Sequence, residues 1–227
     1  MTKLGLALFF AALTSSGAMA ADLGLEVAAE PAAPVAADGN YYASVFGGAA
    51  LVDDLNYDAS TDVEGSSYFD TGLDVSGAFG YAFGNGLSVE AQVGYLRSDQ
   101  TGGTYGPFDV PVTGTGTVLY GMINAWYGVD LDGITPFVGG GVGVASLTLD
   151  SVYTGDLFSA STFEDTETTY AAQVGAGVAV ELTDSLELVG RYRYFMTGDV
   201  GFVDGQGTTL TASFGSHLVD VGLKLAF

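Results

Sequence analysis

From residue 40 onward, apolar side chains alternate with small or polar ones, in stretches separated by turn-forming residues. Successive side chains of a β-strand point to opposite faces of a sheet, so this alternation predicts strands with one apolar face. The pattern therefore predicts an all-β protein. Eight such stretches can be distinguished, at residues 40–52, 68–83, 87–98, 115–131, 134–149, 168–182, 185–198 and 214–227.

The gaps between these stretches are alternately long and short. The short gaps hold Gly84-Asn85-Gly86, Asp132-Gly133 and Thr183-Asp184, and Asn-Gly and Asp-Gly are strong signals of tight hairpins. Short turns on one side and long loops on the other are typical of outer-membrane barrels. We predict an eight-stranded antiparallel up-and-down transmembrane β-barrel, although periodicity alone leaves a soluble lipocalin-like barrel open. The long gaps are residues 53–67, 99–114, 150–167 and 199–213.

The two faces of the stretches differ in a way that favours lipid outside the barrel. In the last stretch Val219, Val221 and Leu223 share one face, whereas Asp220 and Lys224 share the other. The polar faces carry mainly Gly, Ala and Ser, whereas a water-facing surface normally carries interspersed Lys and Glu. Aromatic residues lie mostly near the ends of the stretches, as in interfacial girdles. We therefore expect the apolar side chains to face lipid and the few charges to face the lumen.

The charges expected in the lumen have both signs. An eight-stranded barrel is just wide enough to be filled by side chains, and buried charges need partners. We expect Arg191 and Arg193 to pair with Glu90 and Glu187 or with residues near them. A structural plug is the first interpretation, and a gated ion path is the alternative. The predicted lumen network is Glu90, Glu187, Arg191, Arg193, Lys224 and Asp220, and the other charges assigned to the inner face are Asp74, Asp130 and Glu181.

The first 39 residues do not follow the strand pattern. Residues 1–20 combine Lys3, a short apolar stretch and Ala18-Met19-Ala20, which is the pattern of a secretory signal peptide. The apolar stretch is too short for a membrane helix, which needs about 20 residues. Residues 21–39 are rich in Ala and Pro and are predicted to form a flexible periplasmic leader. The barrel domain is expected to cover residues 40–227.

Composition excludes several classes of function. The chain has 27 acidic and 5 basic residues, and a surplus of that size rules out electrostatic binding of nucleic acid. It has no Cys and a single His, so a thiol nucleophile, a Cys-ligated metal and a His-rich metal site are excluded. We expect no cofactor. The acids of the long gaps have the oxygen ligands that Ca²⁺ and Mg²⁺ prefer, but no spacing matches an EF-hand loop, and solvated loops are the simpler interpretation.

Two motifs resemble those of a known family. Asp220-x-Gly222-x-x-Leu225-x-Phe227 is similar to the terminal signal read by the barrel-assembly machinery, and residues 135–143 are similar to a TPYVGAGVG-like strand of alphaproteobacterial members. With the Ala/Pro-rich leader, they make the chain resemble the small eight-stranded outer-membrane barrels of Gram-negative bacteria, which include opacity-type "porin family" surface proteins. The resemblance covers residues 40–227.

The resemblance implies an integral protein of the cell outer membrane, with no cell-wall anchoring role. The implied partners are outer-membrane lipids, lipopolysaccharide, periplasmic chaperones and the assembly machinery, and we expect a monomer. We predict a non-enzymatic protein with a structural or surface-interaction role through four acidic extracellular loops. A narrow porin-like channel for ions or small solutes is the first alternative.

A lipid A-modifying enzyme is the second alternative, because small barrels with that activity use Ser, His and an acid. Ser216 and His217 are adjacent in sequence and therefore point to opposite faces of their strand. The same-face neighbours of His217 are Gly215 and Val219, neither of which is a nucleophile. The Gly-rich run from Gly139 to Gly143 lies within a strand, so we assign it to close packing rather than to phosphate binding. We predict that the protein is not an enzyme.

Overall fold

The computed structural model describes residues 39–59, 64–105, 108–155, 158–203 and 209–227. The predicted signal peptide, and all of the predicted leader except Gly39, lie outside the described residues. No helix in the described part of the chain is long and apolar enough to cross a membrane. The strands are β1 Asn40–Val52, β2 Leu55–Ala59, β3 Glu64–Phe69, β4 Gly72–Ala82, β5 Leu87–Tyr105, β6 Phe108–Val110, β7 Val112–Gly128, β8 Ile134–Gly155, β9 Phe158–Thr183, β10 Leu186–Thr197, β11 Val200–Val203, β12 Thr209–Ala212 and β13 Gly215–Ala226.

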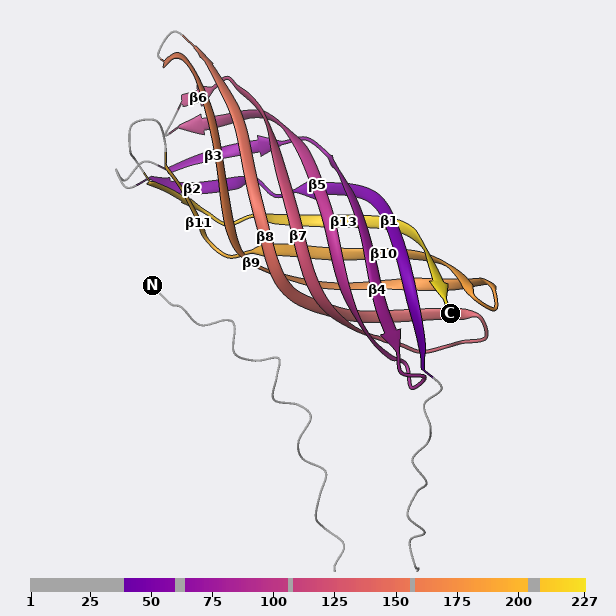
Figure 1. Ribbon diagram of the computed structural model, residues 1–227. Helices are drawn as coiled ribbons and strands as arrows, with labels where there is room; N and C mark the ends of the chain where they lie inside the picture. The colour runs from indigo at the N-terminus through magenta and orange to yellow at the C-terminus, as the bar shows by residue number, and fades with distance from the viewer. Residues whose placement is uncertain (1–38, 60–63, 106–107, 156–157, 204–208) are drawn as a thin grey trace, which may run out of the picture. The chain divides into compact units, whose positions relative to one another are not determined.

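Eight of these strands form a closed antiparallel ring (Figure 1). Their order is β1-β4-β5-β7-β8-β9-β10-β13, and β13 pairs back with β1 along eleven residue pairs from Tyr42↔Ala226 to Val52↔Ser216. Each predicted stretch corresponds to one ring strand, and β1 has the predicted bounds. The prediction of an eight-stranded up-and-down barrel is confirmed.

Three tight turns connect ring strands at one end of the barrel, which we call the short-turn end. Gly84 and Gly86 have φ of 72° and 88°, and Asp132 and Gly133 have φ of 62° and 84°. These left-handed conformations are the reason that the turns contain Gly and Asp, which adopt them at little cost. The first residues of β1 and the last residues of β13 also lie at this end, where the Phe227 amide donates to the Tyr41 carbonyl at 2.9 Å.

At the opposite end, strand pairing continues into the predicted long gaps. In the second and third gaps, β5 continues to Tyr105, β8 continues to Gly155 and β9 begins at Phe158. The first and fourth gaps contain β2, β3, β11 and β12, and β12 pairs with β2. These segments are rich in Thr and Ser and lie beyond the apolar alternation. Strand pairing rests on backbone hydrogen bonds and needs no apolar face, so the apolar pattern can end before the strands do.

Side-chain burial follows the predicted faces. On the outer surface Leu188 and Val221 are exposed, as are most other Val, Leu and aromatic side chains of that face. Arg191 and Asp220, on the opposite faces of the same strands, are buried in the lumen. A barrel that exposes its apolar side chains and encloses its charges is arranged for a lipid environment.

Candidate functional site

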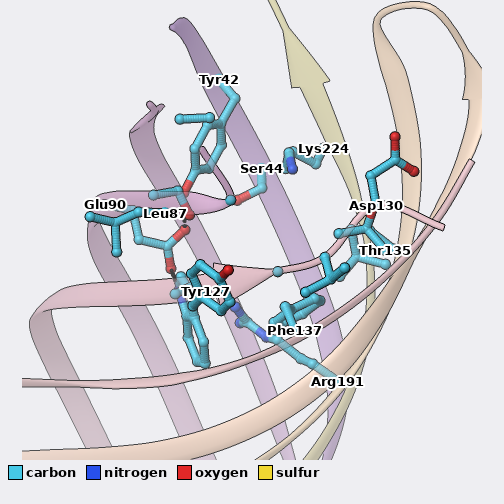
Figure 2. A pocket seen from close by; sticks show the side chains of 18 of the residues that line it. Tyr42, Ser44, Leu87, Glu90, Tyr127, Asp130, Thr135, Phe137, Arg191 and Lys224 are labelled. Carbon is cyan, nitrogen blue, oxygen red and sulfur yellow. Dashed lines mark hydrogen bonds between the residues drawn. The ribbon is translucent and has the colours of Figure 1, made fainter. Parts of the chain in front are cut away.

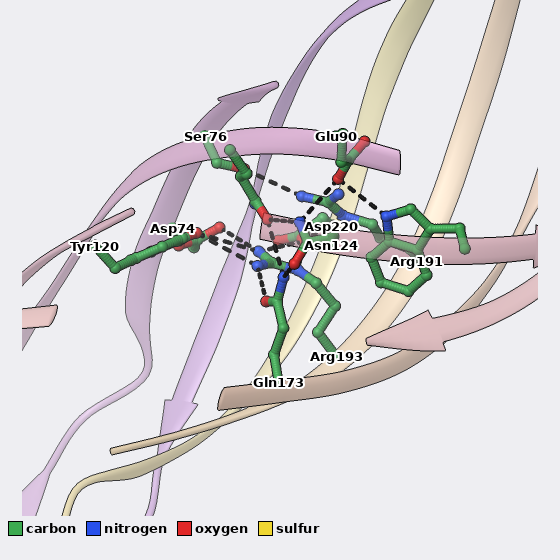
Figure 3. A network of polar contacts seen from close by, with 11 residues as sticks. Asp74, Ser76, Glu90, Tyr120, Asn124, Gln173, Arg191, Arg193 and Asp220 are labelled. Atoms are coloured by element: carbon green, nitrogen blue, oxygen red, sulfur yellow. Dashed lines mark hydrogen bonds and ion pairs between the residues drawn. The ribbon is translucent and has the colours of Figure 1, made fainter. Parts of the chain in front are cut away.

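A network of polar side chains fills the middle of the lumen (Figure 3). Arg193 is at its centre and is 0% exposed. Its guanidinium donates to Asp220 Oδ2 and to Asp74 Oδ2, each at 2.8 Å, and to Gln173 Oε1 at 2.8 Å. Arg191 reaches the same Asp220 oxygen through Nε at 3.0 Å and donates to Ser76 Oγ at 3.1 Å. Two arginines and two aspartates thus form a buried cluster whose charges cancel.

The partners of the two arginines differ from the expected ones. Glu90 and Glu187 were expected to pair with them, but the ion pairs that form are with Asp74 and Asp220. Asp220 is the direct cross-strand neighbour of Arg191, whereas Asp74 reaches Arg193 from β4 across the lumen. A pairing across the lumen depends on the diameter and stagger of the barrel, which the alternation along single strands does not reveal.

Glu90 is also buried, but its hydrogen bonds come from uncharged donors. Tyr42 Oη donates to its Oε2 at 2.9 Å, and Asn124 Nδ2 and Trp126 Nε1 each donate to its Oε1 at 3.0 Å. Among the ion pairs of the described residues, none includes Glu90. The carboxylate of Glu90 is therefore satisfied in hydrogen bonds but has no direct ion-pair partner in the described part of the chain.

The remaining charges assigned to the lumen lie near the short-turn end. Lys224 Nζ is 2.7 Å from Glu187 Oε2, and both side chains are about a quarter exposed, at 26% and 23%. Asp130 and Glu181 are exposed, and Asp130 Oδ1 accepts a hydrogen bond from the Gly133 amide in the turn. These two acids therefore lie outside the buried network, because Asp130 follows the end of β7 and Glu181 is two residues from the end of β9.

Interior glycines make room for the larger members of the network. A Cβ atom at Gly94 would fall on the Tyr120 ring, and one at Gly141 would fall on the Asn124 amide. The amides of Gln92, Asn124 and Gln173 lie 2.6–3.0 Å apart. Close packing, which the sequence predicted for the Gly139–Gly143 run, is what Gly141 provides.

An apolar layer follows the polar network toward the end opposite the short turns, and the alternation of the single strands does not predict it. Tyr120 connects the two, because its hydroxyl donates to Asp74 Oδ1 at 2.8 Å and its ring centroid is 5.0 Å from that of Phe195. The available signal was the appearance of apolar residues on faces that are otherwise polar, as at Leu96 and Leu218. The buried side chains of this layer are Ala50, Leu96, Val118, Tyr120, Met122, Ala145, Leu147, Ala171, Phe195, Phe214 and Leu218.

A cavity of about 460 Å³ lies on the other side of the network, at the short-turn end (Figure 2). Its walls are partly aromatic, with Tyr42, Phe46, Trp126 and Phe137, and its lining also includes Glu90. The lumen of the described residues is thus divided into a cavity, a polar network and an apolar layer.

Ser216 and His217 lie on opposite faces of β13, as predicted. Ser216 is buried in the lumen, and its Oγ donates to the Leu51 carbonyl at 3.2 Å. His217 faces outward, with Nδ1 2.6 Å from Tyr192 Oη and Nε2 3.5 Å from Asp53 Oδ1. The two side chains cannot act together as a nucleophile and its base.

The residues of the predicted assembly signal lie on both faces of β13. Asp220 belongs to the buried network, and Gly222 lies beside the Phe46 ring, where a Cβ atom would clash. Leu225 and Phe227 are exposed on the outer surface. Within the described residues, no cluster of three or more acidic or His side chains has the geometry to hold a metal ion.

Comparisons with known proteins give a consistent result. The family model described as the outer membrane protein beta-barrel domain matches residues 8–217. A protein of Gluconacetobacter diazotrophicus named "Outer membrane protein" is 32% identical over 234 aligned positions, which cover 86% of this chain and 61% of that protein. The chain therefore spans less than two thirds of that relative's length.

Two solved barrels are similar in structure. The outer membrane protease OmpT of Escherichia coli has a TM-score of 0.53 at 9% identity, over 83% of this chain and 97% of that chain. Neisserial surface protein A has a TM-score of 0.41 at 16% identity, over 82% of this chain and 97% of that chain. The likeness to OmpT concerns the fold alone.

Proposed function

Since the chain belongs to the outer membrane protein beta-barrel domain family, we propose that it is a non-enzymatic barrel with a closed lumen. Its role is structural and surface-interacting. The long hairpins at the end opposite the short turns are the contact surface, and short turns face the periplasm in barrels of this type. The predicted export through a signal peptide belongs to the same proposal.

The observation that carries the proposal is the double closure of the lumen. Arg193, Asp74 and Asp220 are buried across the polar network, and Leu96, Phe195 and Leu218 are buried across the apolar layer beyond it. An ion would have to break buried ion pairs and then enter an apolar layer, and each step carries a large desolvation cost. This arrangement supports a plug rather than a channel.

The interactions expected at the membrane follow from the outer surface. The exposed apolar band is suited to lipid, and the net charge of −22 leaves the chain dependent on cations wherever its acidic loops approach anionic lipopolysaccharide. We propose a monomer, because all eight ring strands are paired within one chain. Assembly in the cell is proposed to use periplasmic chaperones and the barrel-assembly machinery.

Planar-bilayer recording tests the closed lumen. Pure, refolded protein is expected to give no stable unitary conductance, and its folded state is checked independently by heat-modifiable migration on a detergent gel. Reproducible single-channel current steps from the folded protein would contradict the closed lumen and support the channel.

The absence of enzymatic activity has its own test. His217→Ala in the producing bacterium is expected to leave the mass spectrum of lipid A unchanged, because Ser216 lies on the opposite face. A lipid A species that disappears with this substitution would support the lipid A-modifying enzyme instead.

A further inference from the structure

The lumen contains one buried carboxylate, Glu90, that takes part in no ion pair of the described residues. Arg191 and Arg193 are matched by Asp74 and Asp220, and Lys224 is matched by Glu187. Glu90 is the remaining buried charge of the lumen and is 6% exposed. Burial of an unbalanced charge is costly, even when hydrogen bonds reduce the cost.

Glu90 is held at the wall of the cavity by rigid neighbours. Tyr42, Asn124 and Trp126 fix both of its oxygens, so its carboxylate is oriented without a counter-ion. Figure 2 shows Tyr42 reaching Glu90 at the cavity wall. The position of the Glu90 carboxylate is therefore fixed before any ligand enters, and this lowers the entropy cost of binding.

A second polar group in the same cavity lacks a partner. The hydroxyl of Ser44, which is 4% exposed, has no hydrogen-bond partner among the described residues. Ser44 lines the cavity with Glu90 and the aromatic side chains. Buried hydroxyl groups are normally hydrogen-bonded, so the cavity offers an unused acceptor in addition to a carboxylate without an ion pair.

We propose that this cavity binds a small organic ammonium ion from the periplasmic side. The ammonium group donates to Glu90, and the apolar body of the ligand lies against Phe137 and Trp126. A volume of about 460 Å³ falls within the range of small-molecule sites, roughly 300–1,000 Å³. The site goes beyond the proposed structural role, and only the side from which the ligand enters rests on the orientation proposed above.

Other ligand classes fit the cavity less well. A metal ion needs several oxygen or nitrogen ligands, and Glu90 is the only buried carboxylate in the described lining. An anion would meet Glu90 directly, and the two cations of the lining, Arg191 and Lys224, are already paired with Asp220 and Glu187. A positive head on an apolar body matches a carboxylate among aromatic rings.

Trp126 supplies a site-specific reporter, because it is the only tryptophan of the chain and donates to Glu90. The folded full-length protein in detergent micelles is titrated with butylammonium, and Trp126 fluorescence is followed. A saturable change is expected, whereas the neutral isostere 1-butanol is expected to bind at least about tenfold more weakly, the scale of one charge-assisted hydrogen bond.

Glu90→Gln removes the charge and keeps an acceptor for Trp126, and it is expected to weaken butylammonium binding at least about tenfold. Asp130→Asn is the matched control, because it removes the same charge from the exposed rim of the cavity. It is expected to change affinity less than about twofold.

Equal affinity for butylammonium and 1-butanol would overturn the proposal, as would unchanged binding in Glu90→Gln or no saturable signal in the unsubstituted protein. If Glu90→Gln does not fold, the amine and alcohol comparison on the unsubstituted protein decides. A conducting lumen in bilayer recordings would contradict the proposed function but would leave this result intact.

Discussion

The polar network and the apolar layer close the same lumen by different physical means. In the network, Arg193 is held between Asp74 and Asp220, so closure depends on ion pairs that must offset the desolvation of every charge. In the apolar layer, Leu96, Phe195 and Leu218 exclude water by packing alone. The first closure fails if one partner is removed, whereas the second fails in proportion to the volume lost. Substitutions in the two regions should therefore have different consequences.

The largest effect is expected from breaking the network at its centre. Arg193→Met leaves Asp74 and Asp220 buried without their shared cation, and removal of one partner from a buried ion pair costs about 3–5 kcal/mol. The free energy of unfolding, measured by urea titration in lipid vesicles with heat-modifiable migration as the signal, should fall by that amount. Arg97→Met is the control, because the Arg97–Asp99 pair is exposed and 3.9 Å long. An equal loss of unfolding free energy in the two variants would show that the buried ion pairs contribute no more to stability than the exposed one.

The apolar layer is expected to respond to lost volume. Leu96→Ala should lower the free energy of unfolding by about 2–5 kcal/mol, because a cavity remains in a packed interior. Leu119→Ala removes the same atoms from the outer surface, where lipid fills the space. Its effect in the same urea titration should be about half as large or less. If Leu119→Ala proves as costly as Leu96→Ala, this layer of the lumen is not tightly packed.

A substitution at the junction of the two regions tests their contact through Tyr120. Gly94→Ala places a Cβ atom on the Tyr120 ring, and overpacking of this kind costs about 1–3 kcal/mol. Gly121→Ala adds the same atom where nothing lies within 4 Å. The thermal midpoint of heat-modifiable migration should fall in the first variant and remain within error in the second. A tolerated Gly94→Ala would mean that the Tyr120 ring is free to move.

The smallest effect is expected at the rim. Lys224→Gln breaks the pair with Glu187, which is partly solvated, and should cost about 1 kcal/mol or less. The difference between this variant and the unsubstituted protein should shrink further in 1 M salt, where charges are screened over about 3 Å. Urea titrations at low and high salt measure both values. A loss of unfolding free energy that does not change with salt would show that the Lys224–Glu187 pair is shielded from solvent, like the ion pairs of the buried network.

The sequence predicts the ring well because alternation and turn chemistry are local properties. Asn85 between two glycines and the Asp132-Gly133 pair mark their turns without any knowledge of the rest of the chain. Alternation also predicts that Arg191 and Arg193 face the lumen, whereas Asp130 and Glu181, near strand ends, are exposed. It fails beyond the lipid band, where β8 and β9 continue without an apolar face.

The contacts within the lumen could not be predicted in the same way. Asp74 and Arg193 are 119 positions apart, and their contact depends on the stagger of all strands between them. The apolar layer is not predicted because Leu96 and Phe195 are isolated apolar residues on faces that are otherwise polar. The donors around Glu90 are uncharged, so the sign of a side chain's charge does not identify them as its partners.

The length of the β8–β9 hairpin has a consequence for the surface that antibodies and phages would contact. β8 contains 22 residues, which at a rise of about 3.3 Å each extend over roughly 70 Å, while a spanning strand needs only about 9–11 residues. About half of β8 therefore exceeds the length that a spanning strand needs, and it remains paired with β9 over that part. With this end facing outward, as we propose, an antibody or phage would meet the β8–β9 ladder before it met lipid, and could select substitutions in the ladder that leave the buried network unchanged.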